Sequence, residues 1–228
     1  MIEEKIIFLH IPKTAGSSLR HIVSQYYSPE QCLLLYYPLP YDEPTLIEIH
    51  KQLPMAKIVY GHVGFGIHEF LGIKGKYVTF LRHPIDRIIS FYKHNANDIH
   101  LPHYTSIQEG MSLFDLANEH PDNHMVRILA NYWSPEIEDE TWLLEQALEN
   151  IRQHFIFIGL MENFEESVIR LSQCLGWTTL PEIPYINVGL ETYIEVDMTT
   201  HMLLEKRNRI DLKLYEIVRE NFLNERQL

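Results

Sequence analysis

A small-residue loop near the start of the chain has the composition needed to hold a phosphate or a sulfate group. Residues 12–18 read PKTAGSS, and they lie between a short apolar run and a segment with helical period. The unpaired N–H groups and the positive dipole of a helix N-terminus attract anions, and Lys13 and the hydroxyl groups add further donors. The plainer alternative is a short turn in which Ser17 or Ser18 only caps the helix.

The order of residues in this loop argues against an ordinary nucleoside-triphosphate enzyme. The Walker A pattern GxxxxGK[ST] places its lysine after two glycines, whereas Lys13 precedes the single glycine, Gly16. A kinase or another phosphoryl-transfer enzyme is still a competing function, and it would depend on a nucleoside triphosphate and magnesium. A non-catalytic nucleotide-binding protein is the second competing function.

A second group of candidate anion ligands follows the run YVTFLR at residues 77–82. Arg82 would end a strand, and Ser90 would lie about two turns into the next helix. Ligands collect at the carboxyl ends of parallel strands, and the planar guanidinium group of an arginine matches the geometry of a phosphate. Alternatively, Arg82 forms a surface ion pair with Asp86 or with another acid.

The elements that must position these residues alternate between strands and helices. Short apolar runs rich in β-branched and aromatic residues predict buried strands, and the longer stretches between them have helical period. The predicted strands are residues 6–11, 57–63, 77–82 and 155–160, with the run 31–37 as a fifth, and the predicted helices are residues 17–26, 45–52, 84–94, 139–153, 163–175 and 196–223. This alternation predicts one α/β domain, residues 1–228, with a central, mostly parallel sheet flanked by helices.

Residues 95–110 read NANDIHLPHYTSIQEG and combine polar and turn-forming residues without a period, which predicts a long loop that could act as a lid. His94, His100 and His103 could suggest a metal site, but their irregular spacing and the absence of nearby cysteine favour chance. The tyrosines at positions 26, 27, 36, 37 and 41 would either line a sugar or phenol pocket or belong to the core and its rim.

The composition narrows the class of protein and its partners. The 228 residues include 19 Lys+Arg and 31 Asp+Glu, and the formal charge of −12 argues against nucleic acid or another polyanion as a partner. Cys32 and Cys174 are too far apart in sequence to suggest a disulfide framework or a zinc site. No signal peptide and no apolar run of membrane-spanning length are evident, so we expect a cytoplasmic protein without a membrane partner. The oligomeric state stays open.

Taken together, these segments resemble the sulfotransferases that use 3′-phosphoadenosine 5′-phosphosulfate, and more closely the branch that includes the uronosyl 2-O-sulfotransferases. The loop PKTAGSS is similar to the 5′-phosphosulfate loop of that family, and RHPIDRIISFY, residues 82–92, is similar to its 3′-phosphate segment. Further similar segments follow in the same order at residues 123–130, 147–175, 185–188 and 210–222. The resemblance implies an α/β fold related to the nucleotide kinases, the phosphosulfate nucleotide as sulfate donor, and no catalytic metal.

The resemblance also assigns roles to individual residues. Lys13 would contact the phosphosulfate and stabilise charge on the leaving phosphate oxygen. Arg82 and Ser90 would hold the 3′-phosphate, and Asn187 would approach the nucleotide. The other donors of the loop would be Thr14, Ala15, Gly16, Ser17 and Ser18.

Transfer of a sulfuryl group to an alcohol also needs a base for the hydroxyl proton. His62 ends a predicted strand in the segment YGHVGF, which is similar to a G-H-V segment of the same branch whose histidine acts as the base. A neutral imidazole with an ordinary pKa of about 6.5 suits that task at neutral pH. The alternatives are a structural role for His62, with His68 or Glu69 as the base, and a role for His83 in binding phosphate.

The resemblance implies a hydroxyl acceptor on a carbohydrate or a small metabolite, with residues 95–110 on the acceptor side. The acidic chain lacks the basic surface that a long sulfated polymer demands, so we expect a small or weakly charged acceptor. To bind an anionic donor against its own average charge, the protein would have to concentrate Lys13, Arg82 and Arg87 in one cleft.

Overall fold

The protein is built around a five-stranded parallel sheet. A computed structural model describes residues 4–36, 42–134, 136–184 and 194–224. All strand pairs are parallel, and the order across the sheet is β2-β3-β1-β4-β5. The strands are β1 Lys5–Leu9, β2 Cys32–Leu35, β3 Ile58–Gly61, β4 Gly75–Leu81 and β5 Phe155–Leu160. The predicted fold class is therefore confirmed, and each of the five predicted strands is present with somewhat different ends.

Helices cover both faces of the sheet because successive strand residues point to opposite sides. On one face Phe8 of β1 packs with residues of α1 and α9, and on the other Ile7 and Leu9 pack with residues of α3, α7, α8 and α11. These helices are α1 Gly16–Val23, α2 Glu43–Gln52, α3 Ile67–Phe70, α7 His124–Ala130, α8 Glu140–His154, α9 Phe164–Cys174 and α11 Arg209–Leu223, with short 3-10 turns at Pro29–Gln31 and Met161–Asn163. The result is a three-layer α/β/α arrangement, as the sequence predicts.

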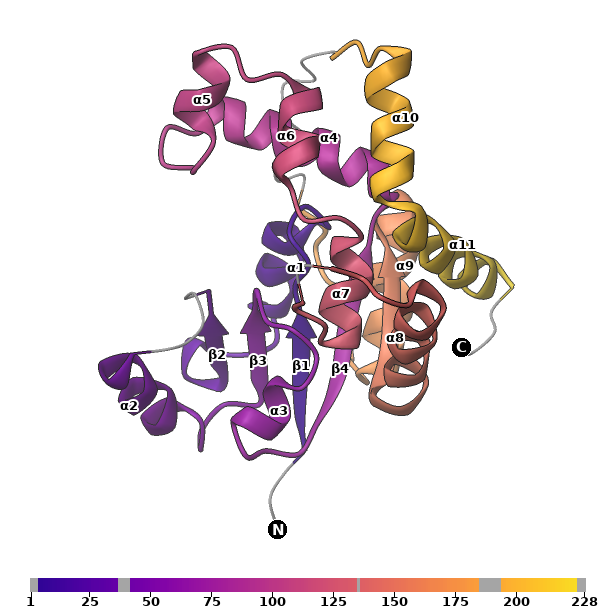
Figure 1. The fold of residues 1–228 in the computed structure, drawn as a ribbon. Coiled ribbons are helices and arrows are strands. Elements are labelled where there is room, and N and C mark those ends of the chain that lie inside the picture. Colours follow the sequence, from indigo (N-terminus) through magenta and orange to yellow (C-terminus); the bar gives the residue numbers. More distant parts are fainter. Residues whose placement is uncertain (1–3, 37–41, 135, 185–193, 225–228) are drawn as a thin grey trace.

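A group of four helices lies beyond the carboxyl ends of the strands, in the upper part of Figure 1. They are α4 Pro84–Asn97, α5 Tyr104–Gln108, α6 Leu113–Glu119 and α10 Met198–Arg207. Ile85 and Ile88 of α4 form a small separate core with Leu116 of α6 and Leu204 of α10. This group covers the edge of the sheet where the loops after β1, β3 and β4 emerge.

The prediction of a single long loop at residues 95–110 is wrong. Helix α4 continues to Asn97, and α5 occupies Tyr104–Gln108. The sequence pattern did not show these helical turns, because several polar side chains in this segment bond to the backbone and no apolar stripe marks the helices. Asn95 donates to the Phe91 carbonyl oxygen over 2.9 Å, and the Asn95 Oδ1 accepts from the His103 N–H over 3.3 Å. A buried asparagine, rather than an apolar stripe, therefore ties the two helices together.

The C-terminal segment is two helices instead of the one predicted at residues 196–223. The break falls at Asn208, between α10 and α11, and Asn123 from a distant segment holds it in place. The Asn123 N–H donates to the Arg207 carbonyl oxygen over 3.0 Å, and its side-chain oxygen accepts from the Ile210 N–H over 2.8 Å. Helical period alone does not show such a break, because the partner lies far away in the sequence.

In the part of the chain that the structure describes, no helix is both long enough and apolar enough to cross a membrane.

Candidate active site

The predicted ligands lie at the carboxyl ends of three neighbouring strands. Since β3, β1 and β4 are adjacent in the sheet, the residues that follow them meet at one edge. There, Lys13 follows β1, His62 follows β3 and Arg82 follows β4, and all three line one cavity of about 470 Å³. Ser90 of α4 lines it from the covering helices. The structure thus brings together the residues that the sequence predicted to act together.

The loop after β1 has the backbone form of an anion cradle. Lys13 and Ala15 have positive φ angles of 73° and 65°, and Ala15 is the N-cap of α1 with no side-chain cap among the described residues. The alternative in which Ser17 or Ser18 caps the helix is therefore not observed. Among the described residues no side chain caps the first N–H groups of α1, and such uncapped N–H groups are what make a helix N-terminus attract anions.

The side chain of Thr14 has a different place from the rest of the loop. It is buried, and its hydroxyl donates to the Ile11 carbonyl oxygen over 2.8 Å. Thr14 is not among the residues that line the cavity, whereas Ala15, Gly16, Ser17 and Ser18 are. The Thr14 hydroxyl thus shapes the turn, and the hydroxyl donors of the loop that face the cavity are those of the two serines.

Gly16 is required by the close approach of a histidine ring. A Cβ atom at position 16 would lie 1.8 Å from the Nε2 atom of His10, so no other residue type fits without moving the ring. The Gly16 carbonyl oxygen accepts a hydrogen bond from the buried Tyr60 hydroxyl over 2.8 Å. The imidazole of His10 and the strand residue Tyr60 therefore hold the start of α1 in a fixed position.

The cavity concentrates positive charge without a counter-acid. Lys13, Arg20 and Arg82 line it, and none of its described lining residues is Asp or Glu. Burial, together with the neighbouring Arg82, lowers the pKa of Lys13 to about 8. Cations that lie close together in a partly desolvated site repel one another. An anion that binds there is attracted by all of them, so its binding is favourable. The Arg82 guanidinium makes only a long contact, 3.5 Å, to the Lys13 carbonyl oxygen.

Two histidines and a tyrosine form one wall of the cavity. The ring centroids of His10 and His62 are 4.6 Å apart, and the Tyr36 ring lies edge-on to His62 with the centroids 4.8 Å apart. Burial lowers the pKa of His62 below its ordinary value. His62 is therefore neutral at pH 7 and has a free nitrogen lone pair, as a general base requires.

The alternatives to His62 lie elsewhere. The Nδ1 atom of His68 is 2.7 Å from the Tyr77 hydroxyl, and neither His68 nor Glu69 lines the cavity. His83 lies beside Asp86, with 3.6 Å between Nδ1 and Oδ2, and it does not line the cavity either. Of the three predicted candidates for the base, His62, His68 and Glu69, it is His62 that lines the same cavity as Lys13.

Arg87 does not belong to the cleft in which the charge argument expected it. Its side chain is fully buried, and the cavity beside Lys13 is lined by Arg82 without it. Arg82 precedes helix α4 and is half buried, whereas Arg87 lies inside the helix and is buried in the protein. Asn187, the last predicted nucleotide ligand, lies outside the described residues.

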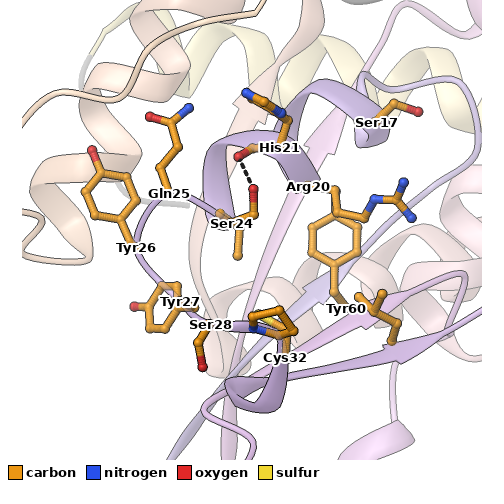
Figure 2. Close-up of a pocket in the computed structure, with 13 residues that line it drawn as sticks. Ser17, Arg20, His21, Ser24, Gln25, Tyr26, Tyr27, Ser28, Cys32 and Tyr60 are labelled. Atoms are coloured by element: carbon orange, nitrogen blue, oxygen red, sulfur yellow. Dashed lines mark hydrogen bonds between the residues drawn. The ribbon is translucent and has the colours of Figure 1, made fainter.

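A second cavity of about 680 Å³ opens beside the first (Figure 2). The two share Ser17 and Arg20, and Tyr26, Tyr27 and Tyr60 also line the second. Hydroxyl, amide and aromatic groups alternate around it, which is a surface suited to a sugar or a phenol. Tyr26 is only partly available, because its ring stacks on Trp177 and its hydroxyl donates to the Thr179 carbonyl oxygen over 2.6 Å.

The described residues contain no group of three or more His, Cys, Asp or Glu side chains able to hold a metal ion. Of the three histidines that could have suggested one, His94 lines the first cavity, whereas His100 and His103 do not.

Two residues of the site were not predicted from the sequence. His10 follows β1, so the rule that singled out Arg82 and His62, the carboxyl end of a strand, would also have found it. Arg20 lies one turn inside α1, and it borders both cavities. No sequence signal separates Arg20 from an ordinary surface arginine.

Comparisons with known proteins indicate the family of this chain. A family model described as "Sulfotransferase family" matches residues 2–228. A heparin sulfate O-sulfotransferase of Drosophila melanogaster is 24% identical over 201 residues, which cover 76% of this chain and 57% of that relative. The chain thus spans little more than half the length of the curated relative it matches.

The fold is also found in a solved structure at low sequence identity. A sulfotransferase from Alicyclobacillus acidocaldarius aligns over 100% of this chain and 98% of its own, with a TM-score of 0.55 and 14% identity. Mouse sulfotransferase SULT7A1, solved in complex with PAP, aligns over 89% of this chain and 63% of its own, with a TM-score of 0.47 and 12% identity.

Proposed function

The chain belongs to the sulfotransferase family, and from that premise we propose that it transfers a sulfuryl group from 3′-phosphoadenosine 5′-phosphosulfate to a hydroxyl group. The observation that carries the proposal is the cavity in which Lys13, Arg82 and Ser90 face His62 with no described carboxylate between them. Such a cavity favours a ligand with several negative charges at one end and a neutral nucleophile at the other.

The residues divide into donor ligands and a base. Lys13 and the N–H groups at the start of α1 bind the phosphosulfate end of the donor substrate, and Arg82 and Ser90 bind the 3′-phosphate. His62 accepts the proton of the acceptor hydroxyl. The acceptor oxygen bonds to sulfur while the bond from sulfur to the bridging oxygen breaks, and 3′-phosphoadenosine 5′-phosphate leaves. Lys13 stabilises the negative charge that develops on that leaving oxygen.

The acceptor is a carbohydrate or a small metabolite. We assign the second cavity (Figure 2) to the part of the acceptor away from the reacting hydroxyl, because Ser17 and Arg20 line both cavities. Aromatic faces such as that of Tyr27 stack on the apolar faces of sugar rings, and the neighbouring hydroxyl and amide groups bond to their edges.

The donor is tested by thermal unfolding with 3′-phosphoadenosine 5′-phosphate, ATP with magnesium, and AMP. A ligand that binds only the native state raises the melting temperature, and at about a hundred times its Kd a rise of roughly 5–10 °C is expected for a chain of this size. We expect that rise with the bisphosphate. Stabilisation by ATP alone would instead identify a phosphoryl-transfer enzyme.

The base is tested with His62→Ala, assayed for sulfated product by mass spectrometry over a panel of hydroxyl acceptors. We expect turnover to fall by roughly 10²–10⁴, as for the loss of a general base. Binding of the bisphosphate should stay unchanged, because His62 faces the acceptor. Turnover within threefold of the unmodified protein would rule out His62 as the base.

A further inference from the structure

His10 lies between the anion-binding loop and His62. The proposed function gives its side chain no part in binding or catalysis. The residue follows β1 directly, and its backbone N–H donates to the Gly61 carbonyl oxygen over 2.9 Å, which fixes it beside His62. The Nε2 corner of its ring abuts Gly16, at the start of α1. His10 also lines the cavity shared by Lys13 and Arg82. The ring thus lies between the anion-binding loop and the base.

The surroundings of His10 keep its imidazole neutral. Burial is the main cause that lowers the pKa of His10 to about 3, and the neighbouring His62, Lys13 and Arg20 add to it. Among the described residues no carboxylate opposes these groups. A histidine in this setting does not take up a proton during a reaction near neutral pH, so it does not compete with His62 as the base. What it offers is one N–H donor and one lone pair.

Tyr36 lies within hydrogen-bond distance of one of the two ring nitrogens of His10. The Tyr36 hydroxyl is 3.2 Å from the Nδ1 atom of His10, and burial raises the pKa of Tyr36 to about 12, so the hydroxyl keeps its proton. An anionic group on the loop favours the tautomer with its hydrogen on Nε2, because a lone pair there would repel the anion. Nδ1 then accepts the hydrogen bond from Tyr36.

From this geometry we propose that His10 donates a hydrogen bond from Nε2 to the sulfuryl group of the donor substrate, while its Nδ1 atom accepts a hydrogen bond from the Tyr36 hydroxyl. The proposal deepens the proposed function and rests on it. It places a neutral hydrogen-bond donor on the side of the loop that faces His62, whereas Lys13 contacts the leaving phosphate. A neutral donor suits this place, because a further cation beside His62 would lower the basicity of that imidazole.

The proposal is tested by comparing the affinities of two nucleotides that differ only in the sulfuryl group. Isothermal titration measures binding of 3′-phosphoadenosine 5′-phosphosulfate and of 3′-phosphoadenosine 5′-phosphate to the unmodified protein and to His10→Phe. Phenylalanine fills the volume of the imidazole and removes its donor. A hydrogen bond to a charged group corresponds to roughly tenfold in affinity, so we expect a tenfold loss for the phosphosulfate and less than twofold for the bisphosphate.

Two further variants keep the test decisive if phenylalanine disturbs the fold. His10→Gln retains a side-chain N–H donor and should bind the phosphosulfate within about threefold of the unmodified protein. Tyr36→Phe removes only the hydroxyl and should weaken phosphosulfate binding by about threefold, without effect on the bisphosphate. His50→Phe, on the exposed part of α2, is the matched control and should change neither affinity.

Three results would overturn the inference. Equal losses for both nucleotides in His10→Phe would mean that the ring only shapes the loop, and no loss for either would mean that it makes no contact. A change in Tyr36→Phe confined to the bisphosphate would refute the role of Tyr36. A failure of the proposed function is recognised separately, because the unmodified protein would then bind neither nucleotide, or would bind them and form no sulfated product with any acceptor.

Discussion

Arg82 and Arg87 belong to one segment, RHPIDR, and the structure places them in opposite electrostatic settings. Arg82 is half buried and faces a cavity together with Lys13, with no acid among the described lining residues. Arg87 is fully buried, and the charge of the equally buried Asp211 acts on it. Both sites concentrate cations in an acidic protein. The difference is that one of them opens to a ligand, whereas the other is closed, with a guanidinium that makes no hydrogen bond to the described residues and is stabilised by the charge of Asp211.

The site around Asp211 is built to stabilise the fold. The two carboxylate oxygens of Asp211 accept from the Met125 N–H over 3.0 Å and from the Val126 N–H over 2.7 Å, at the start of α7. In return, the Asn123 side chain accepts from the Ile210 and Asp211 N–H groups at the start of α11. Each helix thus caps the N-terminus of the other. Burial raises the pKa of Asp211 to about 6, and Arg87 and the two N–H groups oppose that rise.

The comparison teaches how to distinguish a functional cation from a structural one. The buried charge of Arg87 is opposed by the charge of Asp211 without a hydrogen bond between them, and removing that acid should cost stability. A cluster of cations that lacks an acid and borders a cavity raises the free energy of the native state until an anion binds. Substitutions in the Asp211 site should therefore change stability, and those in the Lys13 site should change ligand affinity.

The largest effect is expected for Asp211→Ala. The substitution removes two hydrogen bonds that a carboxylate accepts from the first N–H groups of α7, together with the buried negative charge that acts on Arg87, so the free energy of unfolding should fall by about 3–5 kcal/mol. Urea denaturation followed by circular dichroism measures it. Asp211→Asn, which retains one acceptor oxygen, should lose less. A loss below about 1 kcal/mol in the alanine variant would show that this acid does not stabilise the fold.

Arg82→Met tests the cation site that borders the cavity with Lys13. Loss of one guanidinium contact to a phosphate should weaken binding of 3′-phosphoadenosine 5′-phosphate by roughly 10–100-fold, while the free energy of unfolding changes by less than about 1 kcal/mol. Arg87→Met is the matched variant within the same segment, and it should alter affinity by less than threefold. If the two variants weakened binding equally, the distinction between an open and a closed cation site would fail.

The sequence predicted the open site, around Lys13 and Arg82, better than the closed site, around Arg87 and Asp211. The reason is physical. Lys13, His62 and Arg82 each follow an apolar run that reads as a strand, and parallel strands place their carboxyl ends side by side. Local patterns were therefore enough to bring three distant residues together. The backbone details that complete the site, such as the positive φ of Lys13 and Ala15, leave no pattern in residue type.

The closed site depends on pairs that are far apart in the sequence. Asn123 and Asp211 are ordinary turn and helix residues when read locally, and only the packing of α7 against α11 makes them reciprocal caps. The same packing breaks the predicted C-terminal helix at Asn208. By contrast, the start of α8 was predictable, because Asp139 caps its own helix by accepting from the Trp142 N–H.

The smallest expected effect is a pH dependence that belongs to the open site alone. Without ligand the pKa of Lys13 is about 8, because burial and Arg82 lower it. A bound phosphate favours the charged ammonium and raises that pKa, so binding above pH 8 takes up a proton. Affinity for 3′-phosphoadenosine 5′-phosphate should therefore be flat from about pH 7 to the free pKa and should then fall by up to tenfold per pH unit.

Lys13→Arg separates this titration from any other. The guanidinium group stays charged at every pH at which the protein is stable, so the fall in affinity above pH 8 should disappear even if the affinity itself is lower. The ionisation of the phosphates does not contribute to the change of affinity above pH 8, since their second ionisation lies near pH 6. An equal fall in both proteins would mean that Lys13 is already held as a full cation. The repulsion between Lys13 and Arg82, which separates the open site from the closed one, would then be absent.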